Sequence, residues 1–218
     1  MSRIADLLAR GDAALQRSMN RPLIRGMIDG TVTDAEFTTY LEIEGRFVRT
    51  AARLLGYCIW QEPSWDVTVR HAASLAGLVG EQSEYFAARA VPGLSLPGAS
   101  LPAGALPAGF DALEAVVNDA VATGGYPAVL TCLCAAETLY GTWCAAAGSA
   151  HDRADAVDEW IRMHTTPSFA SGVAFLQERV DAIDPAIFSD ADLDLWFTRM
   201  LEAEDTFHDS ALSTGASV

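Results

Sequence analysis

Apolar residues recur along most of the chain at spacings of three and four, which is the pattern of an amphipathic helix. No segment shows the strict apolar–polar alternation of a half-buried strand. The pattern predicts helices over residues 4–17, 33–60, 66–90, 110–122, 127–147, 153–163, 168–184 and 189–212, with a short apolar segment at 22–28. We therefore expect one all-α domain over residues 1–218, a bundle of seven to eight helices with functional side chains projecting inward.

Local signals place several helix ends. Thr33 and Glu36 have the spacing of a capping box, and Ser189 with Asp192 begins the last helix in the same way. Asp29-Gly30 is a turn signal. Residues 91–109 contain four prolines interleaved with glycine and alanine, so they cannot continue a helix. We interpret this segment as an exposed loop insertion, either a plain solvated one or a lid.

The net charge of the chain limits which molecules it can bind. The chain has 14 basic and 29 acidic residues, a net charge of -15 and a pI near 4.4. Such a surface repels nucleic acid and anionic membranes, and it favours a neutral or cationic small molecule. The charged N-terminal segment does not resemble a signal peptide, and we expect no membrane span. The four cysteines lie in apolar helical patterns and form no C-x-x-C pair, which favours buried free thiols and a cytoplasmic location.

Three segments, in order, resemble the TenA (thiaminase II) family. Residues 21–44, RPLIRGMIDGTVTDAEFTTYLEIE, are similar to its opening H-P-F-x-x-G-x-x-D-G-T-L and F-x-x-Y-L-x-Q-D signature, with Arg21 in place of the histidine. Residues 123–143, TGGYPAVLTCLCAAETLYGTW, resemble the family's S-G-x-F and L-P-C-x-W-x-Y helix. Residues 204–211, EDTFHDSA, resemble its closing E-x-x-F-W-x-x-A stretch.

The resemblance implies a haem-oxygenase-like helical fold that commonly assembles as a homotetramer. It also implies hydrolysis of thiamine or of an aminomethyl aminopyrimidine, in which a cysteine attacks the pyrimidine and a late glutamate handles its proton. The cysteine falls at Ala136 of this chain. Alanine cannot be a nucleophile, so the family's covalent route is closed unless another residue serves.

The same alignment implies the remaining site residues. Glu44 takes the place of the aspartate that holds the aminopyrimidine, and Glu204 is the retained glutamate, so these two are the candidate catalytic residues. Tyr140 is retained, whereas other pocket tyrosines fall at Phe47, at Leu113 and at His164. The expected substrate-binding residues are Glu44, Phe47, Leu113, Ala136, Tyr140 and His164.

Each candidate also has an ordinary structural explanation. Glu44 either lines a cavity or pairs with an arginine, and Glu204 lies in an acidic run that is typical of a solvated face. Glu204 and His208 lie one helical turn apart and could share a metal with His164, but a structural hydrogen bond accounts better for His208, and we expect no metal or cofactor. Glu137 either supports a pocket residue or lies at a subunit interface.

The five tryptophans are expected in the core or at interfaces: Trp60, Trp65, Trp143, Trp160 and Trp196.

These observations favour a TenA-like homo-oligomer, a dimer or tetramer, that binds a small, flat aminopyrimidine-type heterocycle. As an enzyme it would hydrolyse a C–N bond without a cysteine. Glu204 would be the general base on a water molecule, and Glu44 would orient the ring amino group. Two other classes stay open, which are a non-catalytic carrier with the same pocket and a metal-dependent oxidase on the same scaffold.

Overall fold

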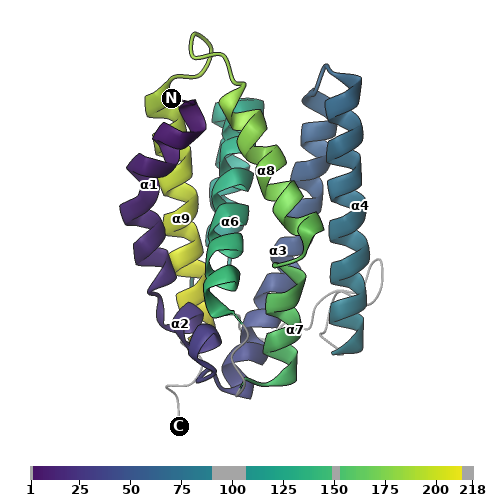
Figure 1. Cartoon of the computed structure of the whole chain (residues 1–218), viewed down its shortest axis with the longest axis vertical. Helices are drawn as coiled ribbons and strands as arrows, with labels where there is room; N and C mark the ends of the chain where they lie inside the picture. Colours follow the sequence, from purple (N-terminus) through teal and green to yellow (C-terminus); the bar gives the residue numbers. More distant parts are fainter. Residues whose placement is uncertain (1, 90–106, 149–152, 213–218) are drawn as a thin grey trace.

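The computed structural model describes residues 2–89, 107–148 and 153–212, and within these ranges the chain forms helices, turns and loops but no strand (Figure 1). In chain order the elements are α1 (Arg3–Met19), α2 (Pro22–Asp29), α3 (Asp34–Gln61), α4 (Trp65–Ala88), α5 (Ala112–Asp119), the π-helical turn η1 (Ala120–Gly124), α6 (Gly125–Ala147), α7 (Asp155–Met163), α8 (Pro167–Asp181) and α9 (Asp190–Leu212). The predicted all-α bundle is confirmed. Most of the predicted loop at 91–109 lies outside the described residues.

The predicted helix starts have the expected hydrogen bonds. The Thr33 hydroxyl accepts from the Glu36 backbone N–H, and the Glu36 carboxylate accepts from the Thr33 backbone N–H at 2.8 Å. Ser189 and Asp192 repeat this arrangement before α9, with distances of 3.2 and 2.9 Å. Both boxes satisfy backbone donors that a helix N-terminus otherwise leaves unpaired.

The predicted helix break at residues 123–125 is a change of helix geometry. The π-helical turn η1 ends at Gly124, and Gly125 follows with a φ of +66°. A Cβ added to Gly124 would lie 2.3 Å from the Ala128 Cβ and 3.0 Å from Nε1 of Trp196. Only glycine therefore permits this close approach of the start of α6 to α9.

Helix α6 is the centre of the bundle, with α9 and α1 on one side and α8 and α3 on the other (Figure 1). The helical run Ala112–Ala147 is long and apolar enough for a membrane span, which the sequence pattern did not predict. However, 78% of its most apolar window is buried inside the protein, as in a core helix. Burial on all sides explains why α6 is apolar around its whole circumference.

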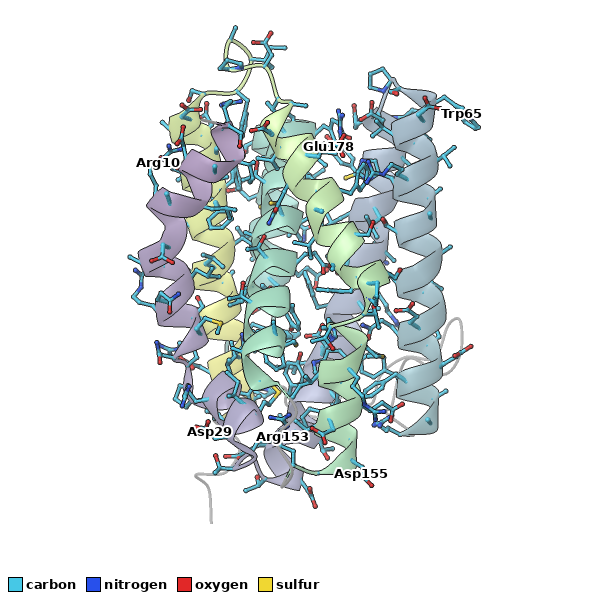
Figure 2. The ribbon with its side chains drawn as sticks, in the orientation of Figure 1. Arg10, Asp29, Trp65, Arg153, Asp155 and Glu178 are labelled. Carbon is cyan, nitrogen blue, oxygen red and sulfur yellow. The ribbon has the colours of Figure 1, made fainter. Side chains whose placement is uncertain are left out.

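Arg153 fixes the C-terminal end of α6. Its buried guanidinium donates to the carbonyl oxygens of Ala147 and Gly148 at 3.0 and 2.7 Å, and to that of Ile28 at 2.8 Å. It also donates to the Asp158 carboxylate at 2.7 Å. Figure 2 shows Arg153 at the end of the bundle where α2, α6 and α7 meet. One side chain thus pairs carbonyls that the helix end leaves free.

Helix α4 is the least embedded of the long helices. It runs alongside α3 at the edge of the bundle (Figure 1), and its fully buried residues are His71, Gln82, Tyr85 and Phe86. Near its start, Nε2 of His71 lies 3.0 Å from the Tyr126 hydroxyl, which donates to Glu62 at 2.7 Å. This polar contact ties α4 to the start of α6, while the middle of α4 faces a cavity.

The tryptophans separate into two groups. Trp143, Trp160 and Trp196 are buried, as expected of core residues. Trp60 and Trp65 are 83% and 76% exposed, so the core interpretation is wrong for these two. Figure 2 shows Trp65 at the outer end of α4, pointing away from the bundle. The interface interpretation of this pair stays a prediction.

The two groups predict very different effects on stability. Trp143→Ala should lower the free energy of unfolding by about 3–5 kcal/mol, because it empties a fully buried site. Trp60→Ala, the matched control, should change it by about 0.5 kcal/mol or less. Urea denaturation of both variants at low protein concentration measures the difference. Equal losses would contradict the assignment of Trp143 to the core.

Candidate functional site

A cavity of about 400 Å³ lies between α3, α4, α6 and α8, within the range of small-molecule sites. Residues of these four helices form its walls, together with Met163 and His164 at the end of α7 and Glu204 of α9. Most of the lining is apolar or small, and a few acidic side chains interrupt it. Such a mixture suits a ligand with an apolar body and a few polar groups.

The structure brings together most of the predicted site residues. Those that line the cavity are Glu44, Phe47, Ala136, Tyr140, His164 and Glu204. Leu113 is the exception, because it lies on α5, is 1% exposed, and belongs to the apolar core. Helix α5 packs against α9, η1 and α3, and Leu113 is buried in this packing. The expected place of Leu113 in the cavity wall is therefore corrected.

Glu44 is held by tyrosines, and no arginine of the described ranges pairs with it. The Tyr140 hydroxyl donates to Oε2 of Glu44 at 3.0 Å, and the Tyr40 hydroxyl lies 2.9 Å from that of Tyr140. Burial raises the pKa of Glu44 to about 7, although these hydroxyls oppose the shift. Glu44 can therefore change its protonation state near neutral pH.

Glu204 has a more extreme environment. Its side chain is completely buried from solvent, and neither carboxylate oxygen has a hydrogen-bond partner within the described residues. Nδ1 of His208 lies 3.7 Å from Oε2 of Glu204, which is too far for a hydrogen bond. Burial, followed by the charges of Glu44 and Glu137, raises the pKa of Glu204 well above its usual range. Without a ligand, this environment favours the protonated form of Glu204.

The two histidines near the site are neutral. Burial lowers the pKa of both His164 and His208 to about 4. Nδ1 of His164 lies 2.8 Å from the Trp160 carbonyl oxygen, so this nitrogen carries the proton and Nε2 is an acceptor. His208 packs among the rings of Tyr40, Tyr140 and Phe207. The sequence did not indicate that Tyr40 joins this cluster.

Glu137 lines the cavity itself, one position after Ala136 and one turn before Tyr140. It is the only charged residue in α6, and burial raises its pKa to about 7. The sequence left open whether it supports a neighbour or meets another subunit. The structure places it in the cavity wall.

The cysteine thiols lie elsewhere. All four cysteines are free and buried, and none of them lines the cavity. Burial raises the pKa of Cys132 and of Cys134 to about 12, so neither is a thiolate near neutral pH. At the position expected for the nucleophile, Ala136 presents a methyl group to the cavity. In the part of the chain that the structure describes, no three His, Cys, Asp or Glu side chains are grouped to hold a metal ion.

The wall that α4 contributes to the cavity was not predicted from the sequence. Its lining residues recur at helical spacing and are mostly small or polar, namely Arg70, Ala73, Ser74, Gly77, Leu78, Glu81 and Gln82. Gln82 is 8% exposed, and its Oε1 has no hydrogen-bond partner within the described ranges. The small residues that recur on one face of α4 could have indicated this wall, because small side chains leave space between helices.

The raised pKa of Glu137 predicts that the free energy of unfolding falls as the pH rises and Glu137 loses its proton. The folded state binds the Glu137 proton more tightly than the unfolded state does. The stability linked to this proton is therefore fully present below pH 4.5 and is lost as the pH rises through about 7. Glu137→Gln removes the effect and should therefore gain about 2 to 3 kcal/mol of stability over the wild type between pH 5 and pH 8.

Chemical denaturation at the two pH values measures this gain. Glu42→Gln, on the exposed side of α3, is the matched control. Its stability relative to the wild type should not increase between pH 5 and pH 8. A Glu137→Gln variant whose stability tracks the wild type at both pH values would show that this carboxyl is well solvated.

The fold is similar to that of several solved TenA structures. A TenA homologue from P. horikoshii OT3 matches with a TM-score of 0.82 at 14% identity, over 99% of this chain and 100% of that one. A TenA family transcription regulator from Silicibacter sp. TM1040 matches with a TM-score of 0.81 at 16% identity, over 97% and 96%. A putative TenA-like thiaminase from Sulfolobus solfataricus P2 matches with a TM-score of 0.77 at 14% identity, over 100% and 99%.

Sequence comparison alone finds no matching family model and no matching curated protein. At identities this low, the structural likeness shows the fold and leaves the activity open. It extends over nearly the whole length of both chains, so the cavity lies within the shared architecture. The resemblance noted in the sequence is confirmed at this level: the chain has the TenA fold.

Proposed function

We propose that this protein binds a small, flat aminopyrimidine-type heterocycle in the cavity and hydrolyses a C–N bond on its side arm without a cysteine. The observation that supports this most directly is Glu204, a fully buried carboxyl group at the cavity wall with no partner for either oxygen. An unpaired buried carboxyl is costly to keep. It is compensated when a ligand or a reacting water molecule occupies the space beside it.

Glu44 is suited to hold the ring. Tyr140 already orients its carboxylate, which leaves acceptor capacity for an exocyclic amino group. Phe47 and Tyr140 supply aromatic faces in the same cavity, and such faces stack on a flat ring. In this arrangement Glu44 fixes the orientation of the heterocycle, and the side arm of the heterocycle lies next to Glu204.

The proposed chemistry is a displacement by water. A cationic ligand lowers the pKa of Glu204, which then removes a proton from water as the water oxygen bonds to the exocyclic carbon. The C–N bond breaks, its electron pair leaves with the nitrogen, and ammonia takes the proton from Glu204. The products are the hydroxymethyl heterocycle and ammonium, with no covalent intermediate on the protein.

A non-catalytic carrier would bind the same heterocycle in the same cavity but would not hydrolyse it. Binding of the aminomethyl aminopyrimidine without release of ammonia by the wild type would favour the carrier over the hydrolase. Failure to bind, together with stoichiometric iron or manganese in protein purified without added metal, would instead favour oxidative chemistry on this scaffold.

The role of Glu44 predicts a loss of affinity. Glu44→Ala removes the group that accepts from the ring amino group, and it should weaken binding of hydroxymethyl aminopyrimidine by about 10-fold or more. Isothermal titration calorimetry measures the change, with Glu42→Ala on the exposed side of α3 as the control. Unaltered affinity in Glu44→Ala would remove this residue from the ligand site.

The role of Glu204 predicts a loss of rate without a matching loss of affinity. Glu204→Gln keeps the size and shape of the side chain but cannot accept a proton from water. Ammonia release from the aminomethyl compound should fall about 100-fold or more, whereas its Kd should change far less. Full activity of Glu204→Gln would be incompatible with its role as the general base.

A further inference from the structure

The cavity holds more carboxyl groups than cations. Glu44, Glu137 and Glu204 line it together with Glu81, whereas Arg70 is the only cation among the described lining residues. The Arg70 guanidinium lies 3.9 Å from the centre of the Phe175 ring and donates to Glu178 at 3.0 Å, so it is already engaged. A ligand that brings a positive charge therefore suits this lining.

Glu137 is a carboxyl group in the cavity wall for which the fold provides no partner within the described residues. It has no hydrogen-bond or ion-pair partner within the described ranges, and the rest of α6 is uncharged. Leu133, Ala136, Glu137 and Tyr140 follow the spacing of one helical face, so Glu137 lies beside the residue that holds Glu44. The charge of Glu137 raises the pKa of both Glu44 and Glu204, which places the three groups within electrostatic reach of one another.

Other groups at this end of the cavity are acceptors too. Gln82 lines the cavity and is more than nine-tenths buried, and its Oε1 has no hydrogen-bond partner within the described residues. Glu44 lies 17 residues before Gln61 at the end of α3, and Gln82 lies 17 residues after Trp65 at the start of α4, so the antiparallel pair places them at similar depth. His164 adds the acceptor Nε2. A ligand that satisfies this surface carries several donors.

We propose that Glu137 binds an ammonium group on the ligand's side arm, so that the cavity selects a heterocyclic amine with a positively charged arm over the matching neutral alcohol. This inference rests on the proposed function, because Glu44 must hold the ring for the arm to reach Glu137. Glu44 then recognises the ring, Glu137 recognises the ammonium group of the arm, and Glu204 activates the water that displaces this nitrogen from the exocyclic carbon.

Calorimetry with two ligands on each variant tests the assignment. The probes are the aminomethyl and hydroxymethyl forms of the same aminopyrimidine, and the measured quantity is the ratio of their Kd values. The ammonium form should bind the wild type roughly 10- to 100-fold more tightly. Glu137→Gln should bring the ratio close to one by weakening the amine, while the affinity for the alcohol changes by less than about 3-fold.

Two further variants make the result specific. Glu137→Asp keeps the charge on a shorter arm and should retain a clear preference for the amine, which also controls for folding. Glu84→Gln removes a charge from the exposed side of α4 and should leave the ratio unchanged. Similar affinities for both ligands in the wild type, or a preference that survives Glu137→Gln, would overturn the role of Glu137 and leave the proposed function intact. Failure of both ligands to bind the wild type would overturn the proposed function and this inference with it.

Discussion

The hydrogen bond from Tyr140 to Glu44 is the contact on which the site depends. It joins α6, the central helix, to α3, and it allows a carboxyl group to exist inside an apolar bundle. An isolated carboxylate in such a place costs several kcal/mol, and a donor at 3.0 Å with a second hydroxyl behind it reduces that cost. The tyrosine pair thus fixes the orientation of Glu44 before any ligand arrives.

The cavity remains open because two of its walls are made of small side chains. Ala73, Ser74 and Gly77 of α4 face Ser171 and Gly172 of α8, and none of them reaches across the gap. At one end of α4, His71 and Tyr126 hold the helix to the bundle, whereas Tyr85 and Phe86 pack against Trp160 at the other. A helix that is anchored at both ends and carries small side chains between them leaves space against its neighbours.

The sequence predicts what is locally determined and leaves open what depends on the direction of a side chain. The boxes at Thr33 and Ser189 follow from residues three apart, so they could be identified without a fold. Glu44 and Glu204 came from the resemblance, since an acidic residue on an apolar stripe has several explanations. The prediction for Leu113 was wrong, because Leu113 packs in the apolar core and an aligned position alone does not place a side chain in the cavity wall. The cavity face of Glu137 depends on how α6 is rotated against α3 and α8, which its uniformly apolar sequence cannot specify.

The same acidic groups link ligand binding to proton release. Burial raises the pKa values of Glu44, Glu137 and Glu204, and neighbouring carboxylates raise those of Glu44 and Glu204 further, so the empty cavity favours the protonated forms of these three acids. A cation in the cavity favours their charged forms, so its binding must expel protons and gains attraction as they leave. A neutral ligand of the same shape gains no such attraction. Selectivity for cations therefore needs no shape difference, since it arises from buried carboxyl groups whose charged forms are disfavoured until a cation arrives.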